Sequence, residues 1–150
     1  MQINGKEMSL QEFERAEGLT VRGHLNLTRS MVERIPNGLC VVGNLYLDGC
    51  RNLREIGNIQ VSGNILAAEC DNLQFTGALK VGGNLDFRGC KQLKGIFDGL
   101  EVEGDFIAWG CQNLQYLPQG TRIEGEASLR GCFGLKNLPD NMRVGYKIWR

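Results

Sequence analysis

The sequence has few of the residues and motifs on which enzymes and metal sites are usually built. It contains one histidine, His24, and three prolines, and aromatic residues make up 7% of the chain. The HExxH and GxSxG motifs and the phosphate-binding GxxxxGK(S/T) pattern are absent, and no nucleophile accompanies His24 in a recognisable motif. We therefore predict that the protein is not an enzyme and uses no metal or cofactor. Catalysis by His24 or Cys40 is the alternative with the least support.

The sequence also has no long apolar run and no net charge. No stretch approaches the roughly 20 apolar residues of a membrane-spanning helix, and the polar start MQINGKEMSLQEF does not resemble a secretory signal peptide. Lys plus Arg balance Asp plus Glu at 17 each, which disfavours a general binder of nucleic acid or anionic membranes. The sequence predicts a cytoplasmic protein without nucleic-acid or membrane partners.

Glycine is abundant, and the sequence contains an internal repeat. A branched apolar residue recurs every 20 or 21 residues, with glycine two residues after most copies, at Val21, Val41, Val61, Val81, Val102, Ile123 and Val144. Further along each repeat a cysteine recurs, at Cys50, Cys70, Cys90, Cys111 and Cys132, and a leucine follows it by three residues. A fixed period over this length predicts a stack of similar coils, each of which buries its apolar side against its neighbours.

Alternation within the repeat predicts β-strands. Around Gly43, the side chains of Leu39, Val41, Leu45 and Leu47 share one face and the intervening side chains share the other. We expect the chain to bend near each glycine, because glycine allows close approach of the backbone. The predicted fold is mainly β: a right-handed parallel β-solenoid of about seven 20–21-residue coils. After the cysteine, spacing by three predicts an irregular or 3₁₀ return.

The N-terminal segment has the signature of a short helix. Ser9 is a favourable N-cap, and Glu12 three residues later completes a capping box. Gly18 is a natural stop, so we expect a helix over Leu10–Glu17 that covers the first coil. This organisation divides the chain into an N-terminal capping helix at residues 1–18 and a single solenoid domain at residues 19–150.

The pattern L-x-L-x-x-C-x-x-L resembles the core of a leucine-rich repeat. The connectors Ile35-Pro36-Asn37-Gly38-Leu39 and Leu117-Pro118-Gln119-Gly120 are similar to the short repeats of bacterial effectors and phage-borne repeat proteins. The V-x-G-x-L run also resembles short right-handed β-helices, which remain the alternative. The resemblance implies a protein-binding module in the cytoplasm, or one delivered into the cytoplasm of a host cell.

The regular cysteines predict buried thiols rather than disulfides. Side chains stacked in register all point the same way, and five of them do not pair off, so a small apolar turn residue is the favoured interpretation. Free thiols are typical of a reducing cytoplasm. Cys40 stands outside this column, on the outward side of its predicted strand.

The outward columns of the predicted strands are the candidate functional surface. The column after the glycine contains Asn44, Asn64 and Asn84, which predicts a structural hydrogen-bonded ladder. The next two columns carry apolar residues that are unusual on a solvated sheet, together with charged residues at their rim. Aromatic and arginine side chains are frequent anchors of protein interfaces, so we predict a partner-binding surface formed by Tyr46, Leu66, Asp86, Arg88, Ile107, Trp109 and Arg130.

Two further interpretations remain open. Self-association through the terminal coils is the alternative to partner binding, with a homodimer formed through the C-terminal edge around Val144–Arg150. An acidic group that includes Glu101 and Glu124 lies near Arg122 in the repeat register, and we expect a solvated, salt-linked ladder there.

Overall fold

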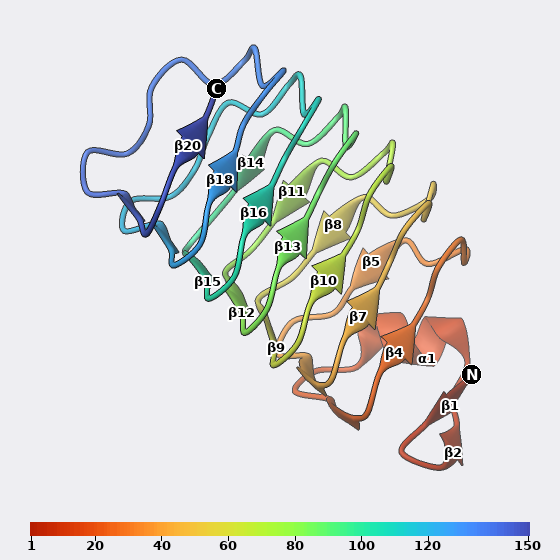
Figure 1. Ribbon diagram of the computed structural model, residues 1–150. Helices are drawn as coiled ribbons and strands as arrows, with labels where there is room; N and C mark the ends of the chain where they lie inside the picture. Colours follow the sequence, from red (N-terminus) through yellow and green to blue (C-terminus); the bar gives the residue numbers. More distant parts are fainter.

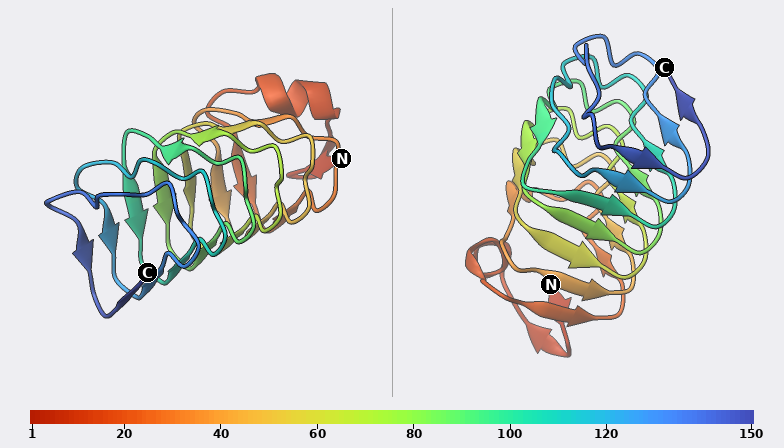
Figure 2. Two further views of the ribbon diagram at one scale, coloured as in Figure 1. Left: turned by 90° about the horizontal axis from the view of Figure 1, so that it is seen from above. Right: turned by 90° about the vertical axis from the view of Figure 1, so that its left-hand side faces the viewer.

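The computed structural model describes residues 1–150, and the chain forms a parallel β-solenoid of about six turns (Figure 1). Three parallel sheets run along the stack, two with seven strands and one with four. Each of the first four coils contributes one short strand to each sheet, which gives the stack a three-sided cross-section (Figure 2). The predicted mainly-β solenoid is confirmed, and the turn number is close to the seven coils expected.

The strands of the three sheets follow one another in the same order in every coil. Sheet 1 consists of β3 (Thr20–Arg22), β6 (Cys40–Val42), β9 (Ile59–Val61), β12 (Leu79–Val81), β15 (Leu100–Val102), β17 (Arg122–Ile123) and β19 (Arg143–Val144). Sheet 2 consists of β4 (Leu25–Asn26), β7 (Leu45–Tyr46), β10 (Ile65–Leu66), β13 (Leu85–Asp86), β16 (Phe106–Ile107), β18 (Ala127–Ser128) and β20 (Ile148–Trp149). Sheet 3 consists of β5 (Arg34–Ile35), β8 (Glu55–Ile56), β11 (Phe75–Thr76) and β14 (Gly95–Ile96).

The core lies inside the coils and is continuous along the stack. One cluster of 39 buried apolar residues contains the inward residues of all three sheets. Equivalent residues pair in register, so that Val41 lies between Val21 and Val61, and Leu45 lies between Leu25 and Ile65. The alternation predicted around Gly43 is confirmed, because Leu39, Val41, Leu45 and Leu47 are all buried. Each coil therefore buries its apolar side mainly against its neighbours.

The corner between sheets 1 and 2 lies at the repeated glycine, and we call it the amide corner. Gly63 donates its backbone N–H to the carbonyl of Gly43 over 2.9 Å, and Asn64 donates its N–H to the side-chain Oδ1 of Asn44 over 2.8 Å. A Cβ at Gly63 would lie 2.7 Å from the carbonyl oxygen of Gly43 and would also collide with the amide of Asn44. Glycine is required because the side chain of the preceding coil occupies this space.

The asparagine column forms the predicted ladder along the amide corner. The side-chain oxygens of Asn44, Asn64, Asn84 and Asp105 each accept the backbone N–H of the equivalent residue in the next coil, at 2.7 to 2.9 Å, and the last donor is the N–H of Glu126. In the first coil the acceptor is His24 Nδ1, 2.9 Å from the N–H of Asn44. The column satisfies backbone donors that the sheets leave without a carbonyl partner.

The turn after sheet 2 contains the cysteine column, and we call it the thiol turn. All five of these cysteines are buried and free. The thiol of Cys90 donates to the carbonyl oxygen of Ala67 over 3.1 Å, and the other four thiols make the equivalent contact at 2.9 to 3.1 Å. Cysteine here fills apolar space, and its thiol donates a hydrogen bond to a carbonyl oxygen that has a second lone pair to accept it.

The N-terminal segment packs against the first coil and contains more than the predicted helix. Helix α1 spans Leu10–Arg15, with the Ser9–Glu12 capping box in place, and it packs against β5. The helix ends before the expected Glu17 because Ala16 is already extended. An unpredicted hairpin, β1 (Gln2–Ile3) and β2 (Lys6–Glu7), precedes it.

The hairpin turn places Asn4 against the outer edge of β3. Asn4 and Gly5 have φ values of 51° and 78°, the left-handed pair expected of a tight Asn-Gly hairpin turn. The side chain of Asn4 donates to the carbonyl of Thr20 over 2.6 Å and accepts the N–H of Arg22 over 2.8 Å. One amide side chain thus occupies the hydrogen-bonding position of a neighbouring strand.

The return from the thiol turn differs from the expected irregular or 3₁₀ segment. It passes through a turn and then through the strands of sheet 3, whose last pairing is an isolated bridge between Gly95 and Tyr116. A third parallel sheet in this position is the arrangement of the β-helix alternative, and it explains why apolar residues such as Ile56 and Ile96 recur there.

Candidate interaction surface

The predicted partner-binding residues lie in two adjacent columns on the outward face of sheet 2. Leu66 pairs in register with Tyr46 and Asp86, and Asp86 pairs with Ile107. Tyr46, Leu66 and Ile107 are partly exposed, and Trp109 is 50% exposed. The structure therefore brings the predicted residues onto one face, and the strands that carry them are hydrogen-bonded to a neighbouring strand on each side.

Asp86 and Arg88 divide this face into two parts. Asp86 is only 5% exposed, so it does not lie on the solvated rim that its charge suggested. Its carboxylate accepts the backbone N–H of Arg88 over 2.9 Å and pairs with the Arg88 guanidinium at 2.8 Å. Hydrogen bonding to Asp86, followed by the attraction of its charge, raises the pKa of Arg88 above its usual value. The pair separates Tyr46 and Leu66 from Ile107 and Trp109.

The C-terminal part of the face forms a groove of about 410 Å³ between Trp109 and Trp149. Ile107 and Ser128 also line this groove. The indole N–H of Trp109 donates to the hydroxyl of Ser128, and that of Trp149 donates to Glu126 Oε2 over 3.0 Å. Both rings are thereby oriented by hydrogen bonds while retaining exposed surface. Trp149 belongs to the outward column but was not among the predicted site residues.

Basic side chains lie over both indole rings. The guanidinium of Arg130 is 5.0 Å from the Trp149 ring centre and the ammonium of Lys147 is 3.6 Å from it, while Arg88 is 6.0 Å from the ring of Trp109. Such cation–π contacts contribute about 0.5–1 kcal/mol each at exposed sites. They hold the cations beside the groove, so that a bound ligand would meet aromatic and positive surface together.

His24 lies in the corner between β3 and β4, whereas Cys40 lies on a strand of sheet 1. His24 is exposed just before β4, where its Nδ1 accepts the Asn44 N–H and its ring packs edge-on against Tyr46 at 6.0 Å. Cys40 is half-buried on β6 of sheet 1. The structure therefore does not bring the two residues together, and it uses the histidine as a backbone acceptor.

A second aromatic cluster lies on sheet 3 and was missed in the sequence. Phe75, Phe97 and Tyr116 are all partly exposed, with ring centres 5.8 and 5.0 Å apart along the stack. The ring of Phe97 lies over Gly95, where a Cβ would be 2.9 Å from it. The sequence signal for this cluster was Gly95, a glycine within a strand, because it leaves room for the ring of Phe97. The rings of Phe97 and Tyr116 are stacked, with 16° between their planes, whereas Phe75 is tilted against Phe97 at 47°.

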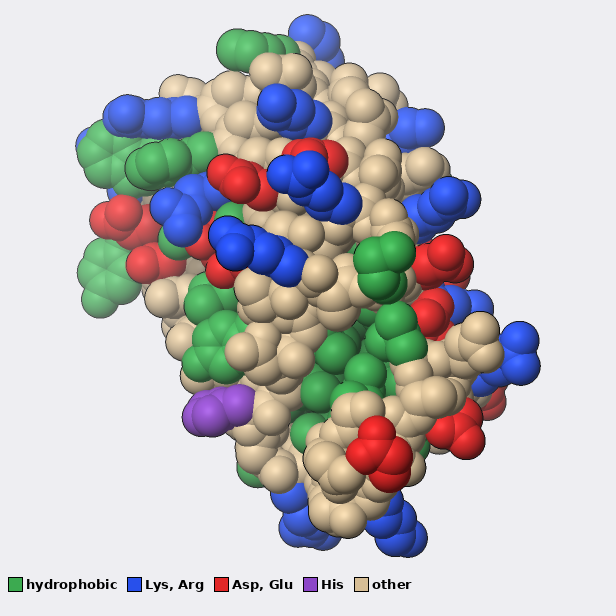
Figure 3. Space-filling model, turned by 90° about the vertical axis from the view of Figure 1, so that its right-hand side faces the viewer, with side chains coloured by type: hydrophobic (Ala, Val, Ile, Leu, Met, Phe, Trp, Pro, Cys, Tyr) green, Lys and Arg blue, Asp and Glu red, His purple; other side chains and the backbone are tan.

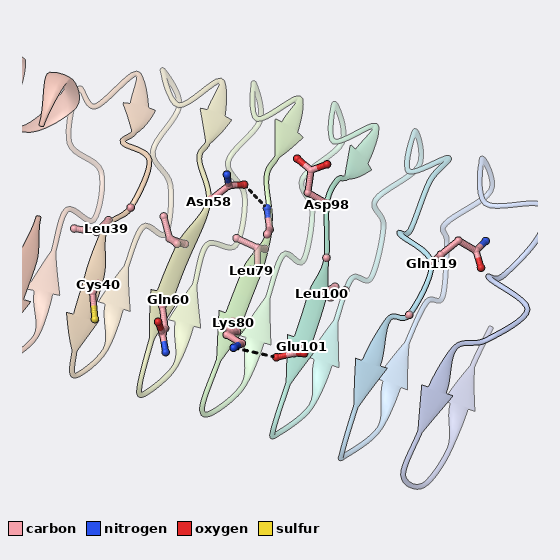
Figure 4. A pocket seen from close by; sticks show the side chains of 15 residues that line it. Leu39, Cys40, Asn58, Gln60, Leu79, Lys80, Asp98, Leu100, Glu101 and Gln119 are labelled. Atoms are coloured by element: carbon pink, nitrogen blue, oxygen red, sulfur yellow. Dashed lines mark hydrogen bonds and ion pairs between the residues drawn. The ribbon is translucent and has the colours of Figure 1, made fainter. Parts of the chain in front are cut away.

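The outward face of sheet 1 is polar and carries a shallow groove of about 500 Å³ along its corner with sheet 3 (Figure 4). Lys80 pairs with Glu101 at 3.8 Å, and Arg122 pairs with Glu124 at 2.7 Å rather than with Glu101 beside it. These pairs are exposed and contribute little to stability. Positive and negative side chains are likewise interspersed on the face shown in Figure 3.

Neither a metal site nor a membrane span is found in the structure. No group of three or more His, Cys, Asp or Glu side chains is placed to hold a metal ion. None of the helices has the length and apolar character needed to cross a membrane. Comparisons of the chain with protein-family models, with curated proteins and with solved structures found no match.

Proposed function

We propose that this protein is a binding module that recognises another protein through the outward face of sheet 2. The observation that carries the proposal is the groove between Trp109 and Trp149, where aromatic and apolar surface remains exposed on hydrogen-bonded strands. A preformed surface of this kind loses little conformational freedom on binding. Tryptophan and arginine are also the side chains that most often dominate binding energy at protein interfaces.

The proposed mode of action is occupancy. A bound partner would be masked or recruited, so the module would act as an inhibitor, an effector or an adaptor without catalysing a reaction. The sequence resemblance to leucine-rich repeats of bacterial effectors and phage-borne proteins supports this class of function, and the family identity itself is part of the proposal. The cytoplasm of the producing cell or of a host cell is the proposed site of action.

An affinity pull-down from cell lysate tests the proposal. The bait is the wild-type protein beside a Trp109→Ser, Ile107→Ser double variant, with melting followed by circular dichroism to establish that the variant folds. A Phe75→Ser, Phe97→Ser variant is the matched control, because it removes exposed aromatic surface from sheet 3 instead. We expect a partner that the control retains and the sheet 2 variant loses. Identical proteins in all three lanes would overturn the proposal.

Self-association is the second candidate, favoured by apolar side chains in the last coil. Tyr146 is 82% exposed, and Phe133 and Ile148 are also exposed. Burial of these side chains between two copies would give a homodimer that includes the edge of β20. Sedimentation velocity over rising concentration tests this candidate, with Tyr146→Ser as the variant. A single monomeric species at every concentration would contradict it.

A further inference from the structure

The groove between Trp109 and Trp149 contains negative charges that are already engaged within the protein. Asp86 is held by Arg88, as described above. Asp105 Oδ1 accepts the backbone N–H of Glu126 over 2.9 Å, and Glu126 Oε2 accepts the indole N–H of Trp149 over 3.0 Å. Each of these carboxylates therefore has a protein donor, although only Asp86 is paired with a cation.

The positive charges beside the groove are not balanced in the same way. Arg130 and Lys147 are both exposed, and neither forms an ion pair. Neither side chain donates a hydrogen bond within the protein, and both cations lie over the Trp149 ring. A guanidinium offers several donors in a planar fork that fits a carboxylate, and an ammonium offers three more. These donors remain available to a ligand that approaches the groove.

We propose that the segment recognised by this groove is acidic, with an apolar side chain that enters between Trp109 and Trp149 while its carboxylates bind Arg130 and Lys147. The inference rests on the proposed function and narrows its partner by charge complementarity. The apolar anchor meets Ile107 and the two indoles, whereas the flanking carboxylates replace water around the two cations. A basic segment would place like charges beside these cations and would bind less tightly than an acidic one.

Intrinsic fluorescence tests this inference directly, because Trp109 and Trp149 are the only two tryptophans of the chain. The probe is a blocked peptide with one leucine flanked by glutamates, and it contains no aromatic residue. Its two controls carry lysine or glutamine in place of glutamate. We expect the acidic peptide to change the tryptophan emission and the lysine peptide to leave it unchanged. Added salt should weaken the binding, since exposed charges are screened.

A charge-reversed variant locates the effect. In Arg130→Glu, Lys147→Glu we expect the affinity for the acidic peptide to fall by about tenfold or more. The matched control, Arg54→Glu with Lys91→Glu, reverses one exposed arginine and one exposed lysine outside the groove and should keep wild-type affinity. Circular dichroism of both variants separates a binding defect from unfolding.

The outcomes distinguish this inference from the proposed function. Equal binding of the glutamine or lysine peptide, or no binding of the acidic peptide at all, would overturn the proposal that the groove recognises an acidic segment. So would an equal loss in both charge-reversed variants. The pull-down with Trp109→Ser, Ile107→Ser stands independently of these peptides, so a partner lost there would preserve the binding face even if the acidic preference failed.

Discussion

The amide corner and the thiol turn lie at opposite ends of each sheet 2 strand and answer opposite needs of the backbone. At the amide corner, a backbone N–H lacks a carbonyl partner, and side chains such as Asn64 supply an acceptor. At the thiol turn, a carbonyl has spare capacity, and thiols such as Cys90 supply a donor. The comparison shows that these two columns are set by backbone chemistry, whereas the outward column between them is free to vary.

The thiol turn should give the largest response, through pH. Burial, and to a lesser extent the thiol of Cys70, raises the pKa of Cys50. Hydrogen bonds between neighbouring thiols, and then burial, raise the pKa values of Cys90 and Cys111. The same hydrogen bonds lower the pKa values of their partners Cys70 and Cys132, which therefore add no loss of stability above pH 8.5. The thiols of Cys50, Cys90 and Cys111 stay protonated in the folded state, while in the unfolded chain they ionise near pH 8.5. Above that pH the unfolded state holds fewer protons, so stability falls as pH rises.

The expected loss is about 1 kcal/mol for each such thiol between pH 8.5 and 9.5, or about 3 kcal/mol for the three, and it approaches about 1.4 kcal/mol per thiol and pH unit at higher pH. Urea unfolding under reducing conditions at pH 7.5, 8.5 and 9.5 measures it. The variant Cys90→Ala should show a shallower pH dependence because one of the three groups is gone. A free energy of unfolding that stays flat over this range would contradict the buried column.

Gly63→Ala should break the amide corner. The new Cβ would meet the Gly43 carbonyl at 2.7 Å and displace the Asn44 amide, so the two coils must separate locally. We expect a loss of about 3 kcal/mol in the free energy of unfolding, typical of overpacking with little room to relax. Gln60→Ala, at an exposed position of the same coil, is the control and should change stability little. Similar values for both variants would refute the close approach.

Asn64→Leu should remove the acceptor while keeping a side chain of similar size and branching. The N–H of Asn84, now 2.7 Å from Asn64 Oδ1, would lose its partner at a cost of about 1–3 kcal/mol. Asn64→Asp retains an acceptor, and Asp105 already fills this role for Glu126 in the same column. Thermal or urea unfolding should therefore rank wild type and the Asp variant together, well above the Leu variant.

His24→Asn should have the smallest effect and would sharpen the same comparison. The variant extends the asparagine column into the first coil and replaces Nδ1 as the acceptor of the Asn44 N–H. We expect a change within about 0.5 kcal/mol. A matched His24→Leu variant lacks an acceptor and should be less stable. If the two variants unfold together, the hydrogen bond to Asn44 contributes nothing measurable.

The features that could be predicted from the sequence are those that repeat. The inward leucines, the glycine bends, the asparagine ladder and the buried cysteines recur at one spacing because every coil imposes the same requirement on them. The Ser9–Glu12 capping box was equally visible because its pattern is local. Sheet 3 was missed because the buried residues that lead into it, such as Cys50, Leu53 and Ile56, are three residues apart, which suggested an irregular return and not an alternating strand.

The candidate site was predicted less completely because it depends on residues that do not repeat. The outward columns were identified in register, yet the burial of Asp86 follows from its neighbour Arg88 and not from its own position. The contribution of Trp149 to the groove depends on Glu126, which accepts its indole N–H, and on Lys147, which lies over its ring. The position of the Phe97 ring similarly depends on the absence of a side chain at Gly95.

The contact between Asn4 and β3 also bears on the solubility of the protein. An uncovered parallel edge is a template on which strands of other molecules can assemble into fibres. The Asn4 amide presents one donor and one acceptor to the Thr20–Arg22 edge and so occupies the groups that such a strand would need. A single side chain on a hairpin turn therefore blocks strand addition at Thr20 and Arg22, and we expect it to disfavour fibre growth from this edge.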